Sequence, residues 1–383
     1  MFRTIIVAQD AILSNAAQSV AFESGCMNIA KVVDHLPNNE YEAALLLTQY
    51  EPEIVLLEAK KAELALAVGE LMRTRRPDVA VLSIGGDFKD GIEKEFARYG
   101  ILPLRSPVTA ESVSETVRIA IYQARPAPVK NLFLFVPAKA GTGATTVLLN
   151  TANSMARDWA HRPLVIEADL HSGVLSLLLN ARVKTPILDT LHRASTLDIQ
   201  AWDECISQSS GFDLLMTDRV SKPPLPTWVN YHQLVRYASP RYDALLVDLP
   251  EVVNAGTADL VHYASKVFIV TTPELPSLTL AGQRLRELEA RGLNRKRAAV
   301  IVNRWHRGDI SSAEIEDILK IKVTTVIRND YRSVHMATMA GTAVKSTTEL
   351  GKSFQAFAGQ LLEKPAIEPA SRTRILLETF AKT

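Results

Sequence analysis

The sequence predicts an α/β protein made of two doubly wound domains, each with a mainly parallel sheet. Short apolar runs such as EIVLLE (53–58) and VAVLSIG (79–85) alternate with helix-like stretches, as is typical of strands buried on both faces. The chain has 383 residues, which is too many for one ordinary domain. The proline-containing stretch ARPAPVKN (124–131) separates two such alternating patterns and therefore indicates a domain boundary.

We expect a first domain over residues 1–124, a linker over 125–130, a second domain over 131–364 and a tail over 365–383. Further apolar runs complete the first domain, giving about five strands. They are TIIVA (4–8), AKVVDHL (30–36) and GILPL (100–104). The second domain opens with NLFLFVPA (131–138), a glycine-containing loop, and a stretch whose apolar residues recur at helical spacing.

Composition excludes several classes of protein. The 43 basic and 42 acidic residues nearly cancel, so we expect no specific nucleic-acid partner. The locally basic stretch 290–308 leaves two interpretations, a DNA contact or a solvated surface, and we favour the surface. Cys26 and Cys205 are far apart in sequence, which argues against a disulfide scaffold or a zinc site. With no secretion signal and no apolar run near ~18 residues, we expect a cytoplasmic protein.

The loop AKAGTGATT (138–146) follows a predicted strand and precedes a predicted helix. Backbone N–H groups in such a turn, together with the helix dipole, attract phosphate. The usual phosphate-binding loop is G-x-x-x-x-G-K-[ST]. Here Ala144 stands in place of the lysine, and Lys139 stands at the front of the loop.

This loop resembles the deviant K-G-G-x-G-K-T-T loop of the MinD/ParA ATPases. The matching positions are Lys139, Gly141, Gly143, Thr145 and Thr146, and the departures are Ala140 and Ala144. The resemblance implies that ATP and Mg²⁺ bind here, with Gly141, Thr142, Gly143, Ala144, Thr145 and Thr146 around the nucleotide. It also implies a homodimer in which Lys139 acts on the nucleotide of the partner subunit.

Later segments resemble the same superfamily in the same order. PLVIEADLHSG (163–173) is similar to the strand that ends in D-x-D, which would make Asp169 a catalytic residue that positions the attacking water. Glu167 takes the first acidic place, and capping a strand is an alternative role for it. YDALLVDLP (242–250) is similar to the Walker B strand, so that Asp248 would hold Mg²⁺ through water, with Thr145 as the other metal residue. AAVIVNRW (298–305) is similar to the strand that ends in an adenine-contacting asparagine, here Asn303; an ordinary turn residue is the alternative.

The first domain resembles the receiver domain of response regulators. In that family an aspartate accepts phosphate, and a Ser/Thr and a lysine assist it. The matching positions here are Glu58, Ser83 and Ser106, and the acidic pair after the first strand is reduced to Gln9-Asp10. Of these positions only Ser83 fits the pattern of the family. We therefore expect an atypical receiver domain that serves as a docking or dimerisation surface, and not a phosphorylation-driven regulator.

The order of the two domains, with ILDTLHRASTLD (187–198) between the acidic segments, is similar to the CpaE/TadZ branch, which takes part in assembling Tad-type (Flp) pili. This resemblance implies a nucleotide-gated dimeric localisation and assembly factor with weak or absent hydrolysis. Its partners would be pilus or secretion components at the inner membrane, and a cell pole is one expected address. The alternative is a cycling ParA/MinD-type ATPase for spatial positioning or DNA partitioning. The tail 365–383 would make at most a weak peripheral membrane contact, and a frayed or packed tail is the favoured alternative.

Overall fold

The chain folds into two units, Met1–Ala127 (unit 1) and Pro128–Thr383 (unit 2). The structure is a computed structural model that describes residues 1–86, 92–105, 107–124, 128–218 and 225–363. The predicted tail 365–383 and Ser106 therefore lie outside the described residues. Within the described ranges, no helix is long and apolar enough to cross a membrane.

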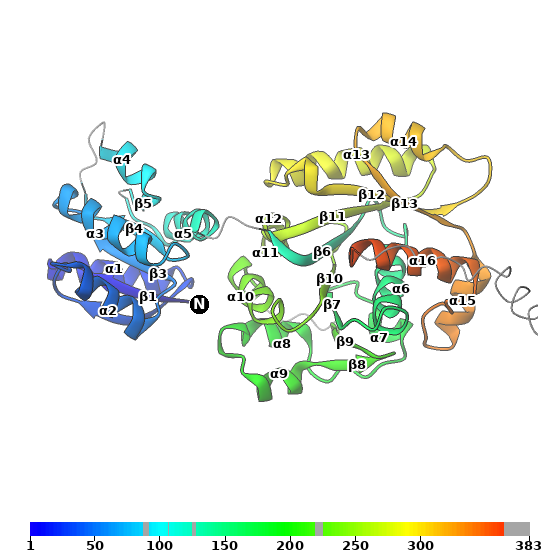
Figure 1. Ribbon diagram of the computed structural model, residues 1–383, viewed down its shortest axis with the longest axis horizontal. Coiled ribbons are helices and arrows are strands. Elements are labelled where there is room, and N and C mark those ends of the chain that lie inside the picture. The colour runs from blue at the N-terminus through cyan, green and yellow to red at the C-terminus, as the bar shows by residue number, and fades with distance from the viewer. Residues whose placement is uncertain (87–91, 106, 125–127, 219–224, 364–383) are drawn as a thin grey trace, which may run out of the picture. The chain divides into compact units, whose positions relative to one another are not determined.

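Unit 1 contains a parallel five-stranded sheet in its described part, with the strand order β2-β1-β3-β4-β5. This order is the flavodoxin-like version of the doubly wound fold. Its strands are β1 (Phe2–Val7), β2 (Met27–Val33), β3 (Ile54–Glu58), β4 (Ala80–Ile84) and β5 (Ile101–Pro103). Its helices are α1 (Ala11–Glu23), α2 (Glu40–Tyr50), α3 (Ala62–Arg75), α4 (Ile92–Arg98) and α5 (Ala110–Ala124) (Figure 1).

Unit 2 contains a sheet whose described strands follow the order β13-β12-β11-β6-β10-β7-β9-β8. Only the pair β8 and β9 is antiparallel among these strands, so the prediction of an α/β fold with mainly parallel sheets is confirmed. The strands are β6 (Val129–Pro137), β7 (Pro163–Glu167), β8 (Ser207–Ser209), β9 (Phe212–Leu215), β10 (Ala244–Asp248), β11 (Ala264–Thr271), β12 (Ala298–Trp305) and β13 (Val323–Arg328).

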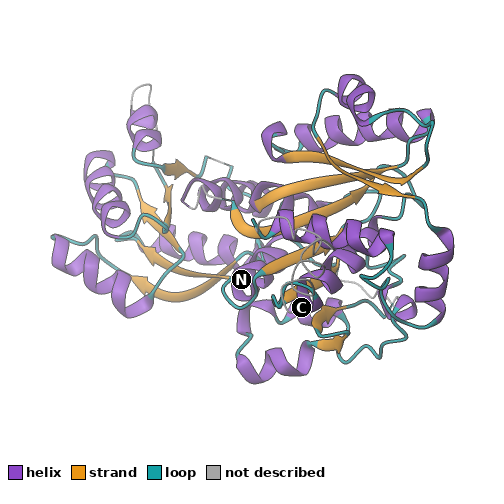
Figure 2. Ribbon diagram, turned by 45° about the vertical axis from the view of Figure 1, so that its right-hand side comes forward, coloured by secondary structure: helices purple, strands orange, loops and turns teal. Residues whose placement is uncertain are grey.

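Helices lie on both faces of each sheet, as parallel strands require (Figure 2). Those of unit 2 are α6 (Ala144–Arg157), α7 (Leu175–Leu178), α8 (Ile187–His192), α9 (Ile199–Cys205), α10 (Trp228–Ala238), α11 (Ala255–Ala258), α12 (Leu260–Tyr263), α13 (Leu275–Ala290), α14 (Ser312–Leu319), α15 (Tyr331–Met339) and α16 (Glu349–Leu361).

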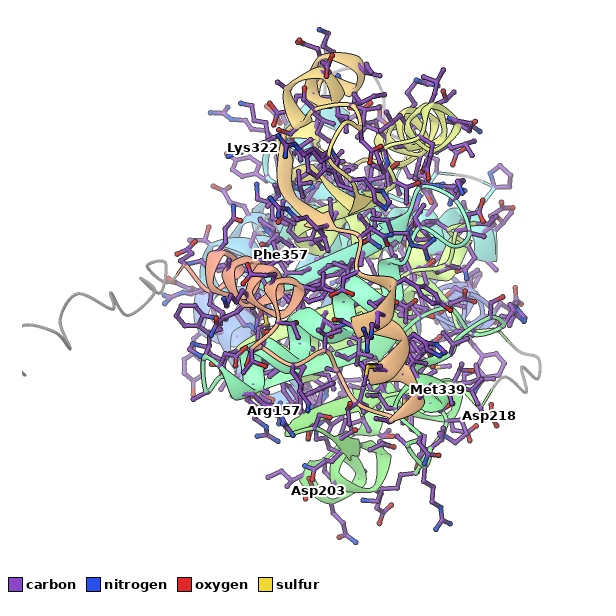
Figure 3. The ribbon with its side chains drawn as sticks, turned by 90° about the vertical axis from the view of Figure 1, so that its right-hand side faces the viewer. Arg157, Asp203, Asp218, Lys322, Met339 and Phe357 are labelled. Atoms are coloured by element: carbon purple, nitrogen blue, oxygen red, sulfur yellow. The ribbon has the colours of Figure 1, made fainter. Side chains whose placement is uncertain are left out.

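Apolar side chains from strands and helices form the core of unit 2. Phe135 on β6 and Phe268 on β11 are buried, with ring centroids 5.3 Å apart. Phe357, labelled on α16 in Figure 3, belongs to this cluster. Its ring meets that of Phe268 edge to face, with centroids 5.4 Å apart. Such aromatic pairs add stability beyond their buried area. This cluster fixes α16 and the sheet against each other and so helps hold α6 in place.

Two boundaries differ from those that the sequence predicts. Strand β6 begins at Val129, so the last residues of the predicted linker 125–130 belong to the sheet. Strand β2 spans Met27–Val33, whereas the predicted run is AKVVDHL (30–36). In both cases pairing with a neighbouring strand extends the element beyond its most apolar residues, since Val129 pairs with Ala264 and Met27 with Phe2.

Candidate nucleotide-binding site

The parallel sheet of unit 2 brings the predicted site segments to one edge. Strand β10 lies between β6 and β7, and Asp248 pairs in register with Phe135 on one side and Glu167 on the other. Carboxyl ends of neighbouring parallel strands meet at the same edge, where ligands of doubly wound folds bind. The glycine loop after β6, Asp169 after β7 and Asp248 at the end of β10 therefore lie together.

The glycine loop (residues 138–143) ends in the first turn of α6. Gly141 and Gly143 have φ angles of 82° and 86°, in the left-handed region that favours glycine. Gly143 is the N-cap of α6, so no side chain caps the first N–H groups of this helix. Free N–H groups at the start of a 14-residue helix form an anion-binding position.

Asn303, near the carboxyl end of β12, makes a direct contact with the glycine loop. Its Nδ2 donates a hydrogen bond of 2.8 Å to the carbonyl oxygen of Thr142, and its side chain is buried. A Cβ atom on Gly143 would lie 2.5 Å from the same Nδ2. The hydrogen bond holds the loop in place, and the close approach of Asn303 explains the need for glycine at position 143. The sequence did not predict this contact for Asn303.

Thr145 and Asp248 form the polar contact at the base of the loop. The Thr145 hydroxyl donates to Oδ2 of Asp248 over 2.7 Å, and Asp248 is only 4% exposed. Burial, together with the charges of Glu167 and Asp169, raises the pKa of Asp248 to about 7, although the Thr145 hydrogen bond opposes this rise. A loop hydroxyl and a strand-end carboxylate in contact are the pair that holds Mg²⁺ in P-loop NTPases.

The positive charge of this site differs from that of the usual loop. Position 144, where the usual loop has a lysine, supplies no charge because it is an alanine. Its methyl group is 5% exposed and belongs to the core of unit 2. Lys139 is half-buried and forms no hydrogen bond or ion pair through its side chain with the residues that the structure describes. Thr146, on the first turn of α6, is half-buried.

The two acidic residues of the β7 segment have different environments. Asp169 is half-buried, and its Oδ1 accepts the N–H of Ser172 over 2.9 Å, which holds the turn after β7. Glu167 is fully buried, and its carboxylate accepts the N–H of Leu175 over 2.8 Å and that of Thr217 over 2.9 Å. Burial raises the pKa of Glu167. Glu167 therefore ties the start of α7 to the segment after β9, and Asp169 stays closer to solvent.

Glu251 is a site residue that the sequence did not single out. Its Oε2 accepts the backbone N–H of Ala140, in the glycine loop, over 2.8 Å. Its position soon after Asp248, beyond Pro250, was the available signal, because this segment leaves the same strand end. The structure thus places a carboxylate on an N–H donor of the loop that would bind phosphate.

Residues that the sequence analysis compared with a receiver domain lie at the carboxyl ends of strands in unit 1. Glu58 is buried, and its Oε2 accepts the N–H of Gln9 over 2.6 Å and that of Asp10 over 3.0 Å. Asp10 caps α1 through Leu13 and pairs with Lys60. The hydroxyl of Ser83 is buried and has no hydrogen-bond partner among the described residues. Backbone donors thus already occupy the Glu58 carboxylate.

A cavity elsewhere in unit 2 is a weaker candidate for a ligand site. A polar cavity of about 710 Å³ lies beside Arg162, which precedes β7, at the opposite end of the strands. Its buried carboxylate, Asp213, already accepts hydrogen bonds from Arg162, Gln208 and Tyr242 over 3.0, 2.9 and 2.7 Å. A carboxylate satisfied by three donors has little capacity left for a ligand.

The basic stretch 290–308 is not a uniform array of free cations. Arg295 pairs with Glu289 over 2.7 Å. Arg297 donates to the carbonyl oxygens of His262 and Ala264 over 2.8 and 2.9 Å. These contacts use part of the basic charge within unit 2 and favour the interpretation of the stretch as a protein surface.

The fold of unit 2, with the glycine loop and Asp248 at the carboxyl ends of its strands, indicates the MinD/ParA-like P-loop ATPase superfamily. Comparison with known proteins supports this class. The septum site-determining protein MinD of Thermotoga maritima is 22% identical over 242 residues, which cover 60% of this chain and 88% of that protein. An uncharacterized ATP-binding protein of Methanocaldococcus jannaschii is 24% identical over 232 residues, covering 59% of this chain and 86% of the relative. No protein-family model matches the chain.

Solved structures support the fold of unit 2. A ParA family ATPase from Chlorobium tepidum superposes with a TM-score of 0.56 at 24% identity, over 60% of this chain and 98% of that chain. A chain of the MinC:MinD cell division protein complex of Aquifex aeolicus gives a TM-score of 0.51 at 23% identity, over 63% of this chain and 99% of that chain. At these identities the likeness shows the fold alone.

Proposed function

We propose that this chain is a MinD/ParA-type protein that binds Mg-ATP and whose nucleotide state controls the pairing of two copies. The observation that carries the proposal is the Thr145–Asp248 contact of 2.7 Å at the base of an open glycine loop. The relatives are named as septum-site and ParA-type proteins. These names support a MinD/ParA-type function in spatial positioning more directly than they support a role in pilus assembly.

The residues of the site fit a magnesium nucleotide. The loop from Gly141 to Gly143 and the first turn of α6 would bind phosphate oxygens through backbone N–H groups. Thr145 would give its hydroxyl to Mg²⁺, and Asp248 would hold the metal through water. Mg²⁺ would favour the ionised form of this buried carboxylate and offset the charge of the phosphates. Thr146 would reach the inner phosphates, and Asn303 would keep the loop in shape for them.

Hydrolysis is slow or absent in this proposal. Phosphoryl transfer depends on positive charge placed where charge develops in the transition state. Ala144 supplies none, and the loss of one lysine contact of ~1.5–3 kcal/mol weakens ATP binding roughly ten- to a hundredfold. Lys139 would act on the nucleotide of the partner subunit, and Asp169 would position the attacking water.

The test compares wild type with Ala144→Lys and Thr145→Ala by calorimetric titration of Mg-ATP and by phosphate release. We expect wild type to bind with little release, Ala144→Lys to bind roughly tenfold more tightly, and Thr145→Ala to lose most of the magnesium-dependent affinity. Light scattering should show a dimer only with Mg-ATP, and Lys139→Ala should reduce it. Failure of wild type and Ala144→Lys to bind would refute the proposal, and rapid release by wild type would favour a cycling ATPase.

Assembly of a Tad-type pilus is the second candidate function. Unit 1 favours it, because a sheet of order 2-1-3-4-5 with Glu58 at the predicted phosphorylation position precedes the ATPase-like unit. That order of units is the one the CpaE/TadZ resemblance implies. In this version the dimer recruits pilus or secretion components at the inner face of the membrane. Deleting the gene should abolish pili, and normal piliation would exclude this role.

A further inference from the structure

Glu251 holds the glycine loop with the same kind of atom that a nucleotide would bring. Its carboxylate oxygen lies 2.8 Å from the backbone nitrogen of Ala140. Carboxylate and phosphate oxygens are both anionic acceptors that bind free N–H groups in a loop. One N–H donor of the loop therefore already has an anionic partner within the chain.

The charges around this contact disfavour a second anion. Two further carboxylates, Asp248 and Asp169, lie at the same strand ends as the loop. Lys139 is the cation of the loop itself, whereas position 144 is an alanine. A phosphate group that enters beside Ala140 would meet the Glu251 carboxylate at short range, where like charges repel strongly.

The segment that carries Glu251 is not held in a helix or a strand. Residues 249–254 form neither helix nor strand, and Val252, next in the chain, is 74% exposed. The contact between Glu251 and Ala140 is itself exposed to solvent. Water competes for a hydrogen bond that is exposed, so a multivalent ligand such as a nucleotide, which makes several contacts at once, can replace it.

We propose that Glu251 is an internal occupant of the phosphate loop, which a nucleoside di- or triphosphate must displace in order to bind. The carboxylate keeps the loop formed when the site holds no nucleotide, and it lowers the affinity for nucleotide. This inference rests on the proposed nucleotide-binding function. It adds to that function a residue that sets how much nucleotide is needed before the protein responds.

The experiment titrates the full-length protein with Mg-ADP and Mg-ATP and compares wild type, Glu251→Ala, Glu251→Gln and Glu274→Ala. Glu274 is a matched control, because it is exposed, follows β11, the strand on the other side of β6 from β10, and caps no helix with its side chain. We expect Glu251→Ala to bind roughly three- to tenfold more tightly than wild type, and Glu251→Gln to lie between them. Glu274→Ala, which removes a charge without touching the loop, should change affinity much less.

A second readout needs no nucleotide. Hydrogen exchange of the segment 138–143 in the nucleotide-free protein should be faster in Glu251→Ala than in wild type or Glu274→Ala. Unchanged or weaker binding by Glu251→Ala, or a gain no larger than that of Glu274→Ala, would overturn the inference while leaving nucleotide binding intact. If wild type and Glu251→Ala both fail to bind nucleotide, the proposed function and the displacement step fail together. The hydrogen-exchange comparison then still tests whether Glu251 holds the N–H of Ala140.

Discussion

Asp248 is the residue on which the chemistry of the site depends most. Its pKa is raised to about 7, against an ordinary value of 3.8, because the carboxyl group is buried and lies beside other carboxylates. The folded state therefore resists ionisation that the unfolded chain undergoes freely. The stability that Asp248 contributes is fully present below about pH 4 and is lost as the pH rises towards 7.

Replacing Asp248 by asparagine should reveal this penalty. We expect Asp248→Asn to gain at least about 1 kcal/mol relative to wild type as the pH rises from 5 to 8, without metal or nucleotide. The measurement is urea unfolding of both proteins at each pH. Mg²⁺ should stabilise wild type at pH 8 and leave the variant unaffected. A stability of Asp248→Asn relative to wild type that stays constant or falls as the pH rises would contradict the shifted pKa of Asp248.

Gly143 offers a second residue-scale prediction. Gly143→Ala must adopt a φ of 86° and also bring its Cβ to 2.5 Å from Asn303 Nδ2. Gly308→Ala is the control, since Gly308 has a φ of 103° and a Cβ there meets nothing within 4 Å. Backbone strain costs roughly 1–3 kcal/mol at either site, and the clash adds to it only at position 143. Thermal unfolding should show the larger loss for Gly143→Ala, and equal losses would mean that Asn303 does not restrict the loop.

At the scale of elements, α16 is held by aromatic packing. Phe357 contacts the rings of Phe135 on β6 and Phe268 on β11. Strand β6 leads into the glycine loop, and β11 pairs with β6. Phe357→Ala should cost about 3–5 kcal/mol of unfolding free energy by leaving a cavity. Tyr331→Ala, on α15 at 72% exposure, should change stability by less than about 0.5 kcal/mol. Denaturant unfolding measures both, and similar losses for the two variants would exclude Phe357 as the residue that anchors α16.

At the scale of the whole molecule, each unit has an apolar core of its own. Val55, Leu57 and Phe96 belong to the core of unit 1, and Phe135 and Phe268 belong to that of unit 2. We therefore expect a fragment of residues 128–363 to fold alone and to bind Mg-ATP within about threefold of the full chain, because each domain normally folds around its own core. Calorimetry of the fragment, with residues 1–124 as the companion fragment, tests this. A fragment 128–363 that folds but loses nucleotide would place part of the site in unit 1.

The sequence alone determined the fold class and the local part of the site. Uninterrupted apolar runs predict buried parallel strands, and the strand–loop–helix order places Gly141, Gly143 and Thr145 in one turn at the start of a helix, because both depend on neighbouring residues only. The tertiary structure decided which distant groups touch that turn. Glu251 reaches Ala140 across 111 positions, and Asn303 reaches Thr142 across 161. Strand order in the sheet sets such contacts, and no local periodicity reports it, so only the folded chain shows an asparagine bracing the loop and a carboxylate resting on it.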